Sequence, residues 1–384
     1  MKKYSLMLAA SGALIATTAH AQSSVTLYGL IDAGFAYTNN VFKSATSHGG
    51  LFQATSGNIN GSRFGLRGTE DLGGGLSAIF VLENGFNVQN GKEGQDSRLF
   101  GRQAFVGLSS TQYGALTLGR QYDSLVDFVA PLSATAGTFG DTDFAHPFDN
   151  DNLNHSLRMS NSVKYTSVDY AGFKFGGLYA FSNSTDFAIN RAYSAGASYN
   201  WGPLKVAAGY LQINGSNSTT NTGGAVDTAE SSASGQGGFV IGAGTQRTFG
   251  GAANYAIGPA LVGFVYTHSQ FTNSTSFGSA HGDVSFNNYE LNGKYNLTPA
   301  VTFGLAYVYT DGHVDNNGPR GDDPKWSQIE AQAIYAFSKR TDVYIEGIYQ
   351  HAIGQGYVAF INGSGGASST DNQVVATIGM RHRF

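Results

Sequence analysis

The sequence has 384 residues and a formal net charge of −4, and only 12% of its residues are charged whereas 13% are aromatic. Soluble domains carry about 25% charged residues, so something replaces the usual charged surface. The absence of cysteine excludes disulfides and thiol catalysis, and the negative charge argues against nucleic-acid binding.

Residues 1–21 are typical of a secretory signal peptide. Lys2 and Lys3 are followed by an apolar stretch over residues 6–16 and by a small-x-small cleavage site ending at Ala21. Cleavage after Ala21 leaves 20 basic against 26 acidic residues in residues 22–384. No later segment approaches the ~18 consecutive apolar residues of a spanning helix. We therefore expect an exported chain that enters a membrane, if at all, as β-strands.

Apolar and polar side chains alternate along most of the remaining chain. In residues 286–297, Tyr289 and Leu291 fall on one face, whereas Asn288 and Glu290 fall on the other. A period of two is that of a β-strand. The polar face carries glycines and charges that suit a wet lumen, and the apolar face carries aromatics near strand ends, where membrane girdles lie. This pattern favours apolar-out and polar-in packing.

The connections between these segments are of two alternating kinds. Seven short ones carry turn chemistry and eight long ones are polar, the first spanning residues 38–61. Their number predicts an all-β fold, a transmembrane antiparallel β-barrel of about 16 strands. The alternative is a secreted β-sandwich or propeller with apolar-in packing. A propeller would show blade-length repeats, and none is found.

Residues 122–156 form the third long connection, between strand-like segments ending at Gln121 and beginning at Ser160. Compact domains rarely contain so long a connection unless it has a function. It mixes aromatic residues such as Phe128 and Phe144 with many aspartates, and a solvated tail would not hold so many aromatics. We expect it to fold into the lumen of the barrel; the alternative is a surface loop.

Basic side chains recur at expected lumen-facing positions on alternate strands of one wall. We expect Phe64, Leu66 and Phe105 to face outward. Because side chains alternate between the two faces of a strand, an outward Phe105 places Arg102 inward. Fixed charges along a wall are how channels discriminate among ions, and a guanidinium tolerates crowding better than an ammonium. The predicted basic wall consists of Arg63, Arg67, Arg102, Arg158 and Lys164.

Five short motifs, in this order and spacing, carry a family resemblance. They are Ser24-Val25-Thr26-Leu27-Tyr28-Gly29, Ser62-Arg63-Phe64-Gly65-Leu66-Arg67-Gly68, Arg102-Gln103-Ala104-Phe105-Val106-Gly107-Leu108, Leu118-Gly119-Arg120-Gln121 and Met380-Arg381-His382-Arg383-Phe384. With them the chain resembles the general diffusion porins of Gram-negative outer membranes, of the kind found in Neisseria and Burkholderia. The resemblance implies a 16-stranded barrel, a homotrimer, and a third loop that narrows the pore. Arg63, Arg102 and Arg158 match the basic wall of that family.

The third loop departs from the pattern of the family. Many relatives carry Pro-Glu-Phe-Gly, whose glutamate faces the arginines, whereas this chain has threonine at the glutamate position, in Thr138-Phe139-Gly140. Asp141 and Asp143 are therefore the candidate acids. Further loop acids are Asp127 and Asp149. Loss of the glutamate beside an intact basic wall favours a modest anion preference.

The last residue, Phe384, ends a row of alternating apolar residues. Resemblance to outer-membrane proteins implies that such a C-terminal aromatic is recognised by the barrel insertion machinery. It also implies contact with outer-membrane lipid and lipopolysaccharide in the bacterial outer membrane.

Passive diffusion of ions and small hydrophilic solutes, without a cofactor or a metal, is the function that these features favour. Two alternatives stay open: a barrel enzyme such as a lipase or protease, and a substrate-specific or ligand-gated channel. The first would need a nucleophile and a base at one place, and no such grouping emerges among the nine histidines. The second would need a binding track, for which Tyr28 and Tyr344 are too few.

Overall fold

The computed structural model describes residues 24–44, 47–138, 140, 142–227, 241–274, 276, 281–315 and 323–384. These residues form one sheet of 17 strands in which each described pair of neighbours is antiparallel. The strands are β1 (Ser24–Ser44), β2 (Ser47–Ser56), β3 (Arg63–Gly73), β4 (Leu76–Gly85), β5 (Gln103–Ser110), β6 (Gly114–Gln121), β7 (Met159–Thr166), β8 (Phe173–Ala180), β9 (Arg191–Trp201), β10 (Leu204–Asn214), β11 (Thr245–Ile257), β12 (Ala260–Ser274), β13 (Gly282–Asn296), β14 (Val301–Val314), β15 (Lys325–Ala336), β16 (Thr341–Ile353) and β17 (Asn372–Arg383).

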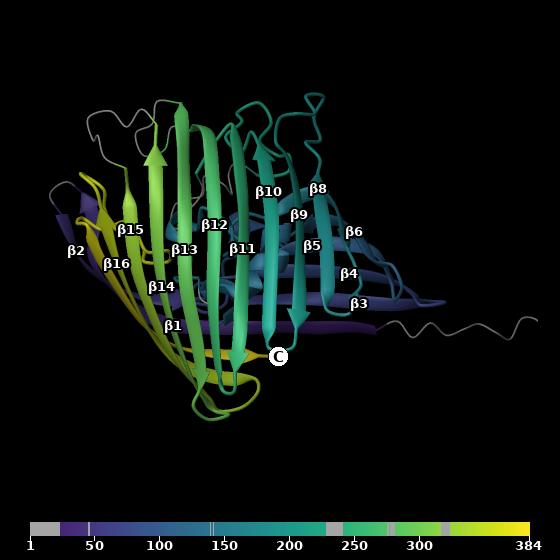
Figure 1. The fold of residues 1–384 in the computed structure, drawn as a ribbon, viewed down its shortest axis with the longest axis horizontal. Helices are drawn as coiled ribbons and strands as arrows, with labels where there is room; N and C mark the ends of the chain where they lie inside the picture. Colours follow the sequence, from purple (N-terminus) through teal and green to yellow (C-terminus); the bar gives the residue numbers. More distant parts are fainter. Residues whose placement is uncertain are drawn as a thin grey trace, which may run out of the picture.

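The sheet closes on itself because β1 pairs with β17, with Leu30 opposite Arg383. On its other side, β1 pairs first with β3 and then with β2, which lie end to end along it. The 17 strands therefore fill sixteen positions around a closed barrel, which confirms the predicted fold class. In Figure 1, β10 to β13 stand upright while β1 and β3 run almost across the view, as expected for tilted strands on opposite walls.

The prediction that residues 38–61 are a loop is wrong for most of that range. β1 continues to Ser44, and β2 returns along it from Ser47 to Ser56. Only residues 57–62 interrupt the strand position that β2 and β3 share. The polar composition of this hairpin hid its strands, because it lacks the apolar row that identifies a lipid-facing strand.

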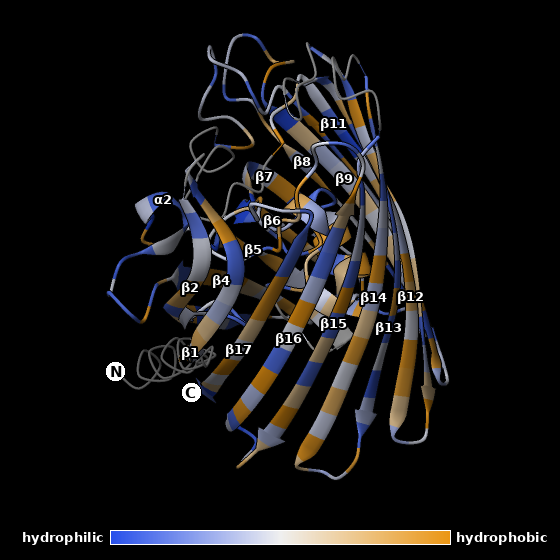
Figure 2. Ribbon diagram, turned by 90° about the vertical axis from the view of Figure 1, so that its left-hand side faces the viewer, coloured by the Kyte–Doolittle hydropathy of each residue, from blue (hydrophilic) through white to orange (hydrophobic). Residues whose placement is uncertain are grey.

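The two faces of the strands are apolar outside and polar inside, as predicted. Leu291 is 62% exposed and Leu305 is 60% exposed, whereas Glu290, between apolar neighbours on β13, is fully buried. Figure 2 shows the resulting alternation of orange and blue along β14 to β17. Such a barrel places its apolar rows where lipid lies and its polar rows around the interior.

Short turns join neighbouring strands at one end of the barrel. Gly202 and Gly258 each follow the last residue of a strand with φ +56°, a conformation that glycine adopts without strain. Each is followed by proline, which fixes the second turn residue. Among the described residues, no helix is long and apolar enough to cross a membrane.

Candidate functional site: the lumen and its inner loop

The segment from Tyr122 to Arg158 links β6 to β7 and enters the barrel through short helical turns. They are η1 (Leu125–Val129), η2 (Ala130–Leu132), η3 (Ala134–Thr138) and η4 (Pro147–Asp149); a further helical turn, α2 (Gly94–Ser97), lies outside this segment. We call residues 122–156 the inner loop. Its described part contacts inward-facing side chains of distant strands, and those contacts define its course.

The first half of the inner loop packs on an apolar area of the lumen wall. Leu125, Phe128, Val129 and Leu132 are buried in one cluster with inward-facing residues of β8 to β12. These wall residues are Leu178, Ala180, Ala192, Ala207, Leu211, Ile213, Ala252 and Val265. The polar-in rule is thus reversed where the loop covers the wall, because there the wall faces protein rather than water.

Glycines allow the loop to approach this wall closely. Gly196 on β9 lies opposite Gly176 on β8 and Gly209 on β10. A Cβ added at Gly196 would lie 2.7 Å from Cδ2 of Phe128, and one at Gly209 would lie 3.1 Å from Cδ2 of Leu125. Because the three glycines lack side chains, the aromatic and aliphatic side chains of the loop can lie directly against the backbone of the wall.

The second half of the inner loop is fixed by a buried ionic group to β13, the strand next to β12 of the same wall. His146 Nδ1 lies 2.6 Å from Asp151 Oδ2, and its Nε2 lies 3.0 Å from Glu290 Oε2 on β13; all three side chains are fully buried. Glu290 Oε1 also accepts a hydrogen bond from the backbone of Ala134 at 2.8 Å. Burial opposes the charged imidazole, but Asp151 and Glu290 together raise the pKa of His146 well above its usual value. An imidazolium with two carboxylate partners results.

The tip of the inner loop meets the interruption between β2 and β3. The backbone N–H of Thr142 donates to the carbonyl oxygen of Asn58 at 2.9 Å. Asn58 and Thr142 line a cavity of about 810 Å³, whereas Asn60 and Gly140 line a second one of about 340 Å³. The contact therefore lies between the two cavities, and residues 57–62 share in dividing the lumen.

The structure brings Arg63, Arg102 and Arg158 close together, and Arg102 and Arg158 line the larger cavity. Arg102 Nε donates to Glu83 Oε1 at 2.8 Å, and its Nη2 donates to the Tyr122 hydroxyl at 3.1 Å. Arg63 Nη1 lies 3.9 Å from the same Glu83 oxygen. The guanidinium carbon of Arg158 lies 5.8 Å from the centre of the Tyr122 ring, within the range of a cation–π contact.

Arg67 and Lys164 face the lumen apart from this group. The guanidinium of Arg67 lies over the ring of Tyr28, 5.2 Å from its centre. Lys164 Nζ donates to Asp127 Oδ2 at 2.7 Å. One predicted inner-loop acid, Asp127, is therefore bound to the last predicted basic residue rather than to an arginine.

The expectation that Phe105 faces outward is wrong. Val106 and Leu108 are 58% and 50% exposed to the outside, and Phe105 pairs with Val81 on the face that carries Glu83. Arg102 nevertheless points inward, because it precedes the first residue of β5 and the alternation of that strand does not reach it.

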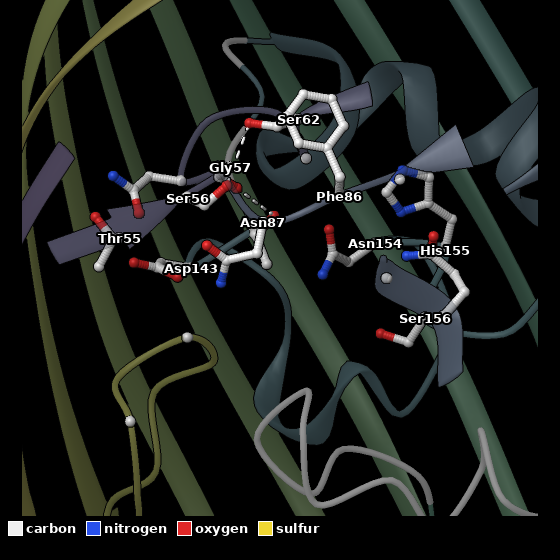
Figure 3. A pocket seen from close by; sticks show the side chains of 18 of the residues that line it. Thr55, Ser56, Gly57, Ser62, Phe86, Asn87, Asp143, Asn154, His155 and Ser156 are labelled. Atoms are coloured by element: carbon white, nitrogen blue, oxygen red, sulfur yellow. Dashed lines mark hydrogen bonds between the residues drawn. The ribbon is translucent and has the colours of Figure 1, made fainter. Parts of the chain in front are cut away.

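The remaining inner-loop acids have different surroundings. Asp143 lines the larger cavity, and Figure 3 shows it across the cavity from His155, whose Nε2 lies 3.4 Å from Arg102. Asp149 accepts backbone hydrogen bonds from Asn154 and Ser156, and so shapes the loop itself. Burial, with a contribution from Asp151, raises the pKa of Asp149 to about 7. Asp141 lies outside the described residues.

Sequence reasoning missed Glu83, Tyr122 and His155, which surround Arg102. The strand of Glu83 is apolar on both faces, with Ile79 and Val81 inside and Phe80 and Leu82 outside, so alternation does not show its orientation. The sequence signal that could have identified Glu83 is that it is a single acidic residue near the end of a strand that is otherwise apolar. Within the described residues, no group of three or more His, Asp or Glu side chains is placed to hold a metal ion.

Phe384 lies beside the start of the barrel. Its backbone N–H donates to the Gly29 carbonyl at 3.0 Å, and the Gly29 N–H donates back at 3.2 Å. Its side chain is 42% exposed, on the lipid side with Met380 and Ile378. This position leaves the aromatic ring accessible, and its role in recognition stays a prediction.

A closed antiparallel barrel with apolar rows outside, polar rows inside and an inner loop across its lumen defines a transmembrane β-barrel channel. Residues 6–352 match the family described as Gram-negative porin. An outer membrane porin protein of Bordetella pertussis is 33% identical over the whole of both chains. The major outer membrane protein P.IB of Neisseria meningitidis is 26% identical over 97% of each chain.

The fold agrees with these relatives. A solved anion-selective porin from Comamonas acidovorans superposes with a TM-score of 0.74 at 24% identity, covering 94% of this chain and 100% of the other. The chain therefore belongs to the Gram-negative porin family and is a protein of the bacterial outer membrane.

Proposed function

We propose that the barrel allows passive diffusion of ions and small hydrophilic solutes and that it prefers anions modestly. The observation that carries the sign of this preference is the group of Arg63, Arg102 and Arg158, of which Arg102 and Arg158 line the larger cavity. Fixed charges at a narrow point attract counter-ions and repel co-ions. Asp143 stands on the other side of the cavity, so the preference should be modest rather than strong.

Purified protein in a planar lipid bilayer should show open, ohmic conductance, with chloride more permeant than potassium in a salt gradient. If the chain forms the homotrimer that its resemblance implies, insertion should occur in steps of three equal units. Complete absence of conductance by folded protein would refute the channel proposal. Conductance with a potassium preference would refute only the assigned sign.

The Arg102→Ala variant should lose part of the anion preference, because Glu83 then keeps only Arg63 as a basic partner at 3.9 Å. The chloride-to-potassium permeability ratio should fall by about threefold, the order expected for one unit charge a few ångströms from a permeating ion in water-like surroundings. The reversal potential in a potassium chloride gradient measures this ratio.

Arg67→Ala is the matched control for Arg102→Ala. It removes the same charge from the same wall, but at a residue that lies over Tyr28 and does not line the larger cavity. Its ratio should stay near that of the wild type. Equal shifts in the two variants would show that total charge, and not the position of Arg102, controls permeation.

We further propose that residues 1–21 are removed as a signal peptide and that residues 22–384 make up the barrel. The barrel contacts lipid and lipopolysaccharide, and the insertion machinery recognises Phe384. The exposed apolar rows support the lipid contact, and the exposed ring of Phe384 supports its recognition.

No chemical step belongs to this proposal. His146 with Asp151 has the geometry of a base and its orienting acid, but both are fully buried, and Glu290 occupies the other ring nitrogen. A substrate could not reach this pair, so it does not favour the alternative of a barrel enzyme.

A further inference from the structure

We propose that Glu83 sets the strength of the anion preference by partly neutralising the basic wall from within. This inference rests on the proposed function and names a residue that determines selectivity. It concerns the acid of β4, which belongs to the wall itself rather than to the inner loop.

Glu83 is held in place by three neighbours on three different segments. Its Oε1 accepts from Arg102 Nε at 2.8 Å and lies 3.9 Å from Arg63 Nη1, and its Oε2 accepts from the Tyr28 hydroxyl at 3.0 Å. The Glu83 side chain is 5% exposed and that of Arg102 is 3% exposed. A buried carboxylate in such contacts stays close to the charges that it neutralises.

The described inner-loop acids are not placed to do this. Asp127 is bound to Lys164, and Asp151 is bound to His146. Asp123 and Asp149 accept backbone hydrogen bonds within the loop itself. Asp143 lies across the larger cavity from His155, the neighbour of Arg102. Among the described acids, the one in contact with Arg63 and Arg102 is therefore Glu83, and its partner Arg102 lines the larger cavity.

The electrostatic consequence follows from the distances. A permeating ion near Arg102 also lies near Glu83, so the two charges largely cancel at its position. Arg158 contacts the Tyr122 ring and lines the cavity, so it contributes more of its charge to the lumen. Removing the charge of Glu83, with the geometry kept, should release the field of Arg102 and Arg63.

The test is the Glu83→Gln variant in the folded barrel, with reversal potential in a potassium chloride gradient as the readout. Glutamine keeps the shape of the side chain and an oxygen that can accept from Arg102. The chloride-to-potassium permeability ratio should rise by about threefold, the order given by one unit charge within a few ångströms. An unchanged ratio in a conducting variant would overturn the inference.

Two further variants separate charge from position. Glu83→Asp keeps the charge but shortens the reach to Arg102, so its ratio should stay close to that of the wild type; a rise as large as that of Glu83→Gln would show that Glu83 only positions Arg102. Asp342→Asn is the matched control, because Asp342 is likewise shared by two arginines, Arg381 at 3.1 Å and Arg383 at 2.8 Å. Asp342 does not line the larger cavity, whereas its partners Arg381 and Arg383 line the smaller one. If the larger cavity controls selectivity, the effect of Asp342→Asn should be smaller, and an equal effect would overturn the inference.

The outcome for the wild type keeps the two proposals apart. Lack of conductance in folded wild-type protein refutes the channel itself. Wild-type conductance with an anion preference that Glu83→Gln leaves unchanged refutes only the role of Glu83.

Discussion

Replacing Glu290 by alanine should release the inner loop from β13 and make the channel larger and noisier. Glu290 is the partner of His146 on β13 and the acceptor for the backbone of Ala134, so one substitution removes two attachments. It also leaves a buried imidazolium with only Asp151. Breaking a buried ion pair on one side costs about 3–5 kcal/mol, which is enough to populate a detached loop.

Single-channel recording measures the effect directly. For Glu290→Ala we expect a higher mean conductance than in the wild type and frequent transitions between conductance levels. Glu290→Gln can still accept a hydrogen bond from Ala134, so its conductance and its transition frequency should lie between those of the wild type and Glu290→Ala. A variant that conducts as steadily as the wild type would show that the apolar packing of Leu125 to Leu132 holds the loop without the ionic group.

The pH dependence of the wild type gives an independent check on the same group. The pKa of His146 is raised above its ordinary value of 6.5, because Asp151 and Glu290 outweigh the effect of burial. The attachment is therefore fully present below pH 6.5 and is lost as the pH rises through the higher value in the folded protein. Noise should increase on the alkaline side in the wild type and should not change there in Glu290→Ala.

Replacing Gly196 by valine should push the inner loop away from the wall and narrow the channel. The first added carbon alone would lie 2.7 Å from Phe128 and 3.1 Å from the carbonyl oxygen of Ser124. Overpacking of this kind costs about 1–3 kcal/mol. Because β9 lies behind the loop, the loop can relieve the contact only by moving into the lumen, and the conductance should fall.

Two companion variants test that explanation. The double variant Gly196→Val with Phe128→Ala removes the side chain that clashes and should restore most of the conductance. Gly347→Val on β16 adds the same side chain where no atom lies within 4 Å, so it should leave the channel unchanged. Failure of the double variant to recover would place the defect in β9 itself.

The faces of the strands and the inner loop could be predicted from the sequence because each has a local signal. Alternation at Asn288, Tyr289, Glu290 and Leu291 reports which side meets lipid, and the aromatics of residues 122–156 indicate a loop that packs. These signals depend on the surroundings of each residue along its own strand, so a single sequence suffices to interpret them.

The sequence could not predict features that depend on what lies across the lumen. The inward-facing positions of β8 to β12 are apolar because the inner loop covers them, and their own strands do not indicate this. The strands within residues 38–61 were missed because their hairpin has polar faces. Glu83 is obscured by a strand that is apolar on both sides. Which aspartate of the loop meets which basic residue depends on the path of the loop, and spacing does not specify that path.

The pairing of β1 with β17 has a consequence for biogenesis. The barrel closes only when the first and last strands pair. An incomplete polypeptide therefore has two unpaired edge strands, which can pair with strands of other chains. Productive assembly therefore requires the nascent chain to be kept apart from its copies until its last strand is available. The reciprocal hydrogen bonds between Gly29 and Phe384 then join the last residue of the chain to β1 and complete the closure of the barrel.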